Sequence, residues 1–167
     1  METAKLVKKI HHVAYRCINA KQTVEWYTKH LDMNFVLAIA EDEVPSTKAP
    51  DPYMHVFLDA GNGNVLAFFE LPNSPPMDRD HNTPAWTQHL AFEVGTMDEL
   101  LAQKTKLEAA GIDVIGVTDH AIFKSIYFFD PNGHRLELAV NIATPAMSKA
   151  LDDAKWDMLN EWDQTKK

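Results

Sequence analysis

Residues 10–17, IHHVAYRC, return in altered form as residues 87–94, TQHLAFEV. Both octapeptides are rich in aromatic and β-branched residues, which is typical of a β-strand. Both also place histidine, an aliphatic residue, alanine and an aromatic residue at the same internal positions, so that His12 corresponds to His89. Because internal self-similarity is the signature of a duplicated unit, the pair predicts two copies of one module.

The residues that follow each octapeptide give the same order of helix and hairpin signals. Residues 20–33 and 96–110 carry apolar side chains at helical spacing. Each helix leads into strand segments that end in a hairpin. The hairpin turns are predicted at 61–63 (GNG) and 130–133 (DPNG), because glycine and asparagine accept positive φ angles readily.

The whole chain is therefore interpreted as β-α-β-β-β twice, an α+β fold of paired βαβββ modules. The modules span about residues 8–72 and 86–141, and a proline-rich linker at 72–86 joins them. We expect both modules to belong to a single domain over residues 1–145.

A C-terminal helix and tail are predicted over residues 144–167. Thr144 is the expected N-cap, and Pro145 suits the first helical position. Apolar residues at helical spacing along this segment need a surface to pack against, either on their own domain or on a partner chain. These residues are Met147, Leu151, Met158 and Trp162.

The composition of the 167-residue chain excludes several classes of partner. A formal net charge of −8 argues against binding to nucleic acid or to an anionic membrane surface. No uncharged apolar run approaches the roughly 18 residues that span a bilayer, and the N-terminus lacks the apolar core of a signal peptide. The single cysteine, Cys17, excludes an internal disulfide and fits a reducing compartment. We expect a cytoplasmic protein.

Four polar residues lie at similar places in the two modules. His12 and His89 share one position, while Glu70 and Glu137 lie in the last strands within the apolar contexts FEL and LEL. A carboxylate inside an apolar strand is costly unless it is paired or bound to a metal. Taken alone, each histidine could also be a core residue, and each glutamate could face solvent. The repetition favours a divalent transition metal held by two imidazoles and one or two carboxylates.

These residues, together with WYTKHLDM at 26–33, resemble the vicinal oxygen chelate superfamily of glyoxalase I, methylmalonyl-CoA epimerase, bleomycin and fosfomycin resistance proteins and extradiol ring-cleavage dioxygenases. The resemblance covers residues 8–141, although Asp32 stands where glycine is common. It implies paired modules whose sheets curl around a metal cleft. Since such modules can be exchanged between partners, the resemblance also implies a homodimer, with the cleft built within one chain or between two.

Residues 118–137 match the pattern of extradiol dioxygenases more narrowly, as TDH-x5-IY-x2-DPNG-x3-E. The resemblance implies that Fe(II) is bound by His12, His89 and Glu137. It also implies that His120 and Tyr127 are catalytic groups beside the substrate. Without the resemblance, His120 would be interpreted as a loop histidine in solvent and Tyr127 as an aromatic residue packed on a helix.

The number of protein ligands separates the chemistries that remain open. Two histidines and one carboxylate leave three positions of an octahedral ion free, which suits a catechol and O₂. Glu70 as a fourth ligand would instead suit a glyoxalase- or epimerase-like isomerase or lyase, with Ni, Zn, Co or Mn and a dicarbonyl substrate. A third alternative is a resistance-type protein that sequesters an aromatic ligand. We favour the dioxygenase because the isomerase gives His120 and Tyr127 no role, although typical extradiol enzymes contain twice as many modules.

Overall fold

A computed structural model of the chain describes residues 6–165. Residues 1–5 of the expected domain and residues 166–167 of the expected C-terminal tail lie outside the described residues. The described chain forms two compact units. The first contains residues 6–88 with the turn at 129–134, and the second contains residues 89–128 and 135–165.

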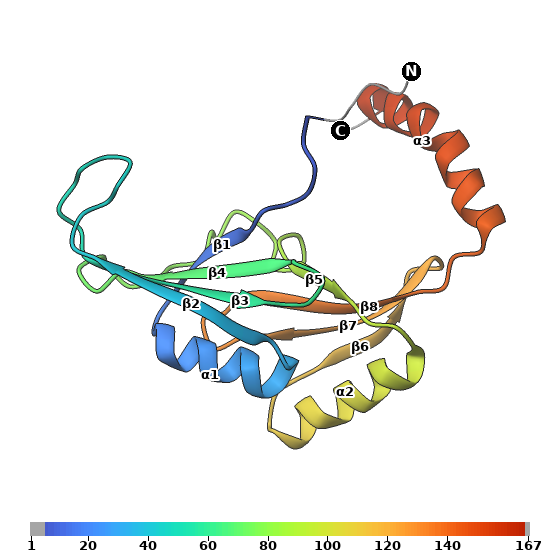
Figure 1. Cartoon of the computed structure of the whole chain (residues 1–167). Helices are drawn as coiled ribbons and strands as arrows, with labels where there is room; N and C mark the ends of the chain where they lie inside the picture. Colours follow the sequence, from blue (N-terminus) through green and yellow to red (C-terminus); the bar gives the residue numbers. More distant parts are fainter. Residues whose placement is uncertain (1–5, 166–167) are drawn as a thin grey trace. The chain divides into compact units, whose positions relative to one another are not determined.

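The first unit is a four-stranded sheet with one helix on one of its faces (Figure 1). The strand order is β1-β4-β3-β2, with β1 parallel to β4 and the other neighbours antiparallel. Its elements are β1 (Val13–Cys17), α1 (Ala20–Leu31), β2 (Asn34–Glu41), β3 (Tyr53–Asp59) and β4 (Val65–Glu70).

The ends of α1 and its packing follow from a few side chains. Asn19 caps the N-terminus by accepting a hydrogen bond from the Gln22 backbone N–H at 2.8 Å. Asp32 ends the helix with a φ of 54°, the left-handed conformation that glycine adopts most easily. Between the two ends, the fully buried Tyr27 lies with its ring centroid 5.1 Å from that of Phe68 on β4. The even-numbered residues of β4 therefore face α1.

The second unit repeats this arrangement. Its strand order is β5-β8-β7-β6, and β5 runs parallel to β8. The helix buries Leu100 and Leu107, and the adjacent strand β8 buries Leu136 and Leu138. The elements are β5 (Leu90–Glu93), α2 (Met97–Ala109), β6 (Ile115–Asp119), β7 (Phe123–Phe129) and β8 (Arg135–Asn141).

The prediction of two βαβββ modules is confirmed by this order of elements. Residues 72–86 contain turns but neither helix nor strand, as the proline-rich linker predicts. The turn at 129–134 belongs to the first unit, because Asp130 accepts a hydrogen bond from the Tyr27 hydroxyl at 3.0 Å. Asp130 also accepts hydrogen bonds from the backbone N–H groups of Asn132 and His134. The aspartate of the DPNG motif thus has a structural role.

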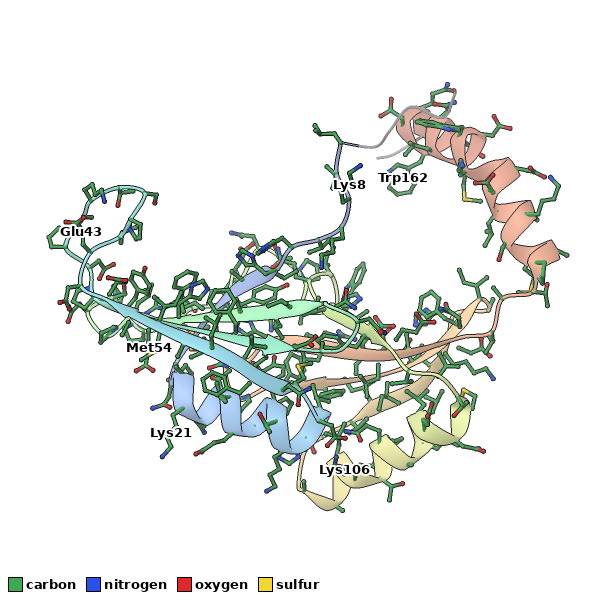
Figure 2. All side chains as sticks on the ribbon, in the orientation of Figure 1. Lys8, Lys21, Glu43, Met54, Lys106 and Trp162 are labelled. Carbon is green, nitrogen blue, oxygen red and sulfur yellow. The ribbon has the colours of Figure 1, made fainter. Side chains whose placement is uncertain are left out.

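The C-terminal helix α3 (Pro145–Thr165) begins as expected, because the Thr144 hydroxyl accepts a hydrogen bond from the Met147 N–H at 3.2 Å. No residue of α3 is buried. Trp162, near its end in Figure 2, is 65% exposed. The expected packing of the apolar stripe on its own domain is therefore not found among residues 6–165. None of the helices in this range is long and apolar enough to cross a membrane.

Candidate metal and catalytic site

In the second unit, polar side chains gather on the sheet face that is turned away from α2. Side chains alternate along a strand, so Glu137 lies on the opposite face from Leu136 and Leu138, which are buried with the α2 residues. Ala91 of β5 is the register partner of Glu137, and His89 precedes Ala91 by two residues. His89 and Glu137 therefore share one face, as the sequence predicted for metal ligands.

Glu137 is a buried carboxylate, 3% exposed, and both of its oxygens have partners. Oε2 lies 2.9 Å from Nε2 of His89. Oε1 accepts hydrogen bonds from the Ser125 hydroxyl and, at 3.2 Å, from the Tyr127 hydroxyl. These contacts offset the cost of burying a charge inside an apolar sheet and fix the direction in which the carboxylate points.

His120 and Tyr127 extend this set of contacts. Nε2 of His120 lies 2.8 Å from the Tyr127 hydroxyl, and the His120 ring stacks on Phe123 at a centroid distance of 4.6 Å. With the Tyr127 hydroxyl donating to Glu137, the same oxygen accepts from His120 in the tautomer that carries its proton on Nε2. Burial, and then the charge of Glu137, raise the pKa of Tyr127, which keeps the phenol protonated. Four predicted residues, His89, His120, Tyr127 and Glu137, thus form one hydrogen-bonded chain.

The first unit places His12 on the sheet face that is turned away from α1. The His12 ring lies 5.9 Å from Phe57 and 6.4 Å from His55, between centroids. Nδ1 of the neighbouring His11 lies 2.8 Å from Nδ1 of His12. His12 belongs to the first unit, and His89 and Glu137 belong to the second.

The sequence reasoning missed His55. Its ring stacks on Phe69 at 3.6 Å, and its Nε2 atom is buried without a hydrogen-bond partner among the described residues. Burial, and then the proximity of His12, lower the pKa of His55. The alternation of side chains along a strand could have revealed His55. It lies in a predicted hairpin strand, on the face opposite to the buried core residues Val56 and Leu58.

The register does not support the expected equivalence of Glu70 and Glu137. In both units the first strand runs parallel to the last strand. The β1–β4 pairing can be aligned with the β5–β8 pairing so that His12 corresponds to His89. In this alignment, the residue of β4 that corresponds to Glu137 of β8 is Ala67. The similar apolar flanks of the two glutamates suggested a correspondence that the hydrogen-bonded pairing corrects.

Glu70 instead supports the N-terminus of α1. It pairs in register with Cys17, on the sheet face that bears Phe68 and therefore faces the helix. Its Oε2 atom accepts a hydrogen bond from the Ala20 backbone N–H at 2.6 Å. This N–H is one of those that a helix leaves without an internal partner, so the carboxylate acts as a cap. By alternation, Glu70 and His12 lie on opposite faces of their sheet.

A cavity of about 860 Å³ also lies on the α1 face of the first sheet. Lys21 of α1 and Met54 of β3, both labelled in Figure 2, line it together with Glu70. The proline-rich loop after β2 contributes Asp42 and Pro52. The cavity is therefore separate from the face that carries His12 and His55.

The structure brings together two of the predicted metal ligands, His89 and Glu137. Among residues 6–165, no three histidine, cysteine, aspartate or glutamate side chains lie close enough to hold an ion. The imidazole nitrogen and the carboxylate oxygen nevertheless fit a transition metal, since both are donor types that such ions prefer and they lie 2.9 Å apart, near enough to be neighbouring ligands of one ion. Ser125 and Tyr127 would not bind the metal, but they donate hydrogen bonds to Glu137 of the kind that commonly orient a carboxylate ligand.

The sequence model of the Glyoxalase/Bleomycin resistance protein/Dioxygenase superfamily matches residues 9–138. The match covers both βαβββ modules and includes His12, His89, His120, Tyr127 and Glu137. The chain belongs to this superfamily, as its motifs and its fold predicted.

Three curated relatives show how varied this superfamily is. The chain is 29% identical to the uncharacterized protein YwkD of Bacillus subtilis, over 80% of this chain and 97% of YwkD. It is 30% identical to the metallothiol transferase FosB of Shouchella clausii, over 72% of this chain and 89% of FosB. It is 27% identical to the putative ring-cleaving dioxygenase MhqA of Bacillus subtilis, over 52% of this chain but only 27% of MhqA.

Solved structures agree with this assignment of the fold. A glyoxalase family protein from Enterococcus faecalis has a TM-score of 0.58 and 28% identity, with 79% of this chain and 97% of that chain covered. The fosfomycin resistance protein FosX of Listeria monocytogenes, solved with Mn(II), has a TM-score of 0.60 and 14% identity, with 86% and 99% covered. At that identity, the likeness to FosX concerns the fold alone.

Proposed function

We propose that the protein is an Fe(II)-dependent extradiol dioxygenase that cleaves a catechol-type aromatic substrate with O₂. The observation that carries this proposal is the hydrogen-bonded chain from His120 through Tyr127 and Glu137 to His89. If Glu137 were only structural, its carboxylate would need hydrogen-bond partners such as Tyr127. It would not need His120 on the other side of the Tyr127 hydroxyl. The partial similarity to MhqA gives further support.

In the proposed site, His89, Glu137 and His12 bind the metal. Bound iron would supply open coordination positions for both catechol oxygens and for O₂, and would pass electrons between them. Ser125 and Tyr127 keep the Glu137 carboxylate in one orientation. His55 lies beside His12, and its Nε2 atom, which has no partner within residues 6–165, suits a hydrogen bond to a bound oxygen atom.

His120 is the proposed acid–base residue. In the tautomer whose Nε2–H donates to the Tyr127 hydroxyl, Nδ1 is the nitrogen that can take a proton from a substrate hydroxyl and then return it. Tyr127 stays neutral because its pKa is raised, and it therefore remains a hydrogen-bond donor throughout the neutral pH range. General acid–base groups of this kind contribute about 10²- to 10⁴-fold to a rate.

The isomerase alternative, with Glu70 as a fourth ligand, loses support from the geometry of Glu70. That carboxylate caps α1 and lies on the opposite sheet face from His12. A different second candidate is favoured by the match to FosB, which covers most of both chains. In that case the same residues would hold a divalent metal for transfer of a thiol to a small electrophilic substrate.

The test is an anaerobic purification with Fe(II) loading, followed by a catechol panel in which O₂ uptake and yellow ring-cleavage product are measured. We expect stoichiometric O₂ uptake by the wild type and none by His89→Ala. The matched control is His81→Ala, since His81 is exposed and contacts the similarly exposed Asp78. Metal binding without O₂ uptake, together with thiol transfer, would replace the dioxygenase with the FosB-like candidate.

We further propose that the protein acts as a cytoplasmic homodimer on a small molecule. The exposed apolar stripe of α3 supports an association between chains, because large exposed apolar patches commonly mark interfaces. Sedimentation at several concentrations tests this directly, and a monomer throughout would contradict it.

A further inference from the structure

Arg135 is a cation on the same face as the proposed site, and nothing in the proposed chemistry uses it. It begins β8 and precedes Glu137 by two residues, so the two side chains project from the same side of the sheet. Its guanidinium carbon lies 4.4 Å from the centroid of the Tyr127 ring. Tyr127 in turn donates to Glu137 and contacts His120, so Arg135 lies directly beside the acid–base chain.

The surroundings of Arg135 leave its charge without an anion. Its Nε atom is buried and has no hydrogen-bond partner, and in the described part of the chain no carboxylate forms an ion pair with it. By contrast, Lys124 on β7 of the same unit pairs with Asp119 at 3.3 Å. A half-buried cation with an unsatisfied donor is costly unless a ligand completes it.

The position of the guanidinium over the Tyr127 ring limits which of its N–H groups a ligand can reach. A guanidinium held over an aromatic face is restrained in position, and its outer N–H groups remain available to a ligand. A guanidinium edge matches a carboxylate with two parallel hydrogen bonds, which few other groups do. Arg135 is therefore prepared for a planar anion that arrives on the Glu137 side of the sheet.

We propose that Arg135 selects substrates that carry a carboxylate on the aromatic ring or on a short side chain. This inference rests on the proposed function, because it names the substrate class of the same site. The carboxylate pairs with the guanidinium, while the two ring hydroxyls are left for the metal that His89 and Glu137 would hold. Arg135 is a specificity residue in this account, and it takes no part in the bond-breaking steps.

Calorimetry under anaerobic conditions tests the inference without turnover. Fe(II)-loaded protein is titrated with catechol, which is neutral, and with protocatechuate and homoprotocatechuate, which carry a carboxylate. We expect the wild type to bind at least one of the two carboxylates about tenfold or more tightly than catechol. Arg135→Met should remove this preference and leave catechol affinity within about twofold, and Arg135→Lys should keep part of it.

Lys124→Met is the matched control, because it removes a cation from the same unit on the opposite side of β7 from Tyr127. A preference that survives in Arg135→Met, or that is absent in the wild type, overturns the inference. If the wild type binds none of the three catechols, the proposed function fails separately. Benzoate, which carries the planar carboxylate without the ring hydroxyls, is then titrated instead, and equal binding or no binding in wild type and Arg135→Met overturns the role of Arg135 as well.

Discussion

At the scale of single residues, the proposed metal site depends on how Glu137 is held. Its carboxylate is buried, and its oxygens meet His89, Ser125 and Tyr127. A carboxylate with three partners cannot rotate freely, so a metal would find its ligand already oriented. The outer hydrogen bonds should therefore affect metal affinity even though they belong to residues that do not bind the metal.

Ser125→Ala tests this directly. The substitution removes the hydroxyl that donates to Glu137 and leaves the buried backbone of β7 unchanged. Fe(II) affinity should fall about 10- to 100-fold, as it does when the outer partner of a metal ligand is lost. A competition titration with a chelator measures it, and Ser148→Ala on exposed α3 is the control. Equal affinity in the two variants would contradict the proposed role of Ser125.

Cys17 gives a prediction about pH. Burial raises its pKa from 9.0 to about 11, and the charge of Glu70 adds to the effect. The unfolded chain therefore releases the thiol proton before the folded chain does, so this contribution to stability is present below pH 9.0 and is lost as the pH rises towards 11. Urea unfolding should show a smaller alkaline loss of stability in Cys17→Ala than in the wild type. Identical dependence of the unfolding free energy on pH in the two proteins would contradict the proposed contribution of Cys17.

Candidate site residues could be predicted from the sequence where they occur in both modules or belong to a motif. His12 and His89 stand in matching octapeptides, and His120, Tyr127 and Glu137 fit one spacing. Ser125 and His55 belong to neither pattern. Their importance depends on which strand lies beside which, because Ser125 reaches Glu137 only across the β7–β8 pair.

At the scale of elements, the pairing of β1 with β4 decides the role of Glu70. Register places it beside Cys17 and under the N-terminus of α1. Sequence reasoning found both strands but matched the two glutamates by their flanking residues. Since a strand's partner is set by hydrogen bonding across the sheet, similar flanks do not guarantee equivalent positions.

Glu70→Ala should therefore affect stability and leave metal binding unchanged. Loss of a helix-capping group costs about 0.5–2 kcal/mol, so urea unfolding should show a decrease of that size. Glu70→Gln should lose less, because its amide oxygen can still accept from Ala20. Glu25→Ala, at an exposed position of α1, is the control. A large drop in metal content in Glu70→Ala would restore the four-ligand alternative.

At the scale of the whole molecule, the duplicated modules could be predicted because each is encoded locally. Helical spacing, turn sequences and strand alternation all lie within a few dozen residues. The place of the turn at 129–134 in the first unit could not be predicted, since it depends on the contact of Asp130 with Tyr27. Residues more than 100 positions apart leave no local pattern.

Deletion of residues 145–167 tests the place of α3. None of its described residues is buried, so the free energy of unfolding of the remaining chain should change by less than about 0.5 kcal/mol at low protein concentration. Circular dichroism during urea unfolding measures this change. A loss above about 2 kcal/mol would mean that the helix packs on its own chain.

The most direct measurement of the central claim is anaerobic Fe(II) titration of five proteins, the wild type, His12→Ala, His89→Ala, Glu137→Gln and Glu70→Gln. We predict one tightly bound ion per chain for the wild type and for Glu70→Gln. Each of the other three should bind at least about 100-fold more weakly while retaining its circular dichroism spectrum. Wild-type affinity in His12→Ala, His89→Ala or Glu137→Gln would contradict the proposed ligand set.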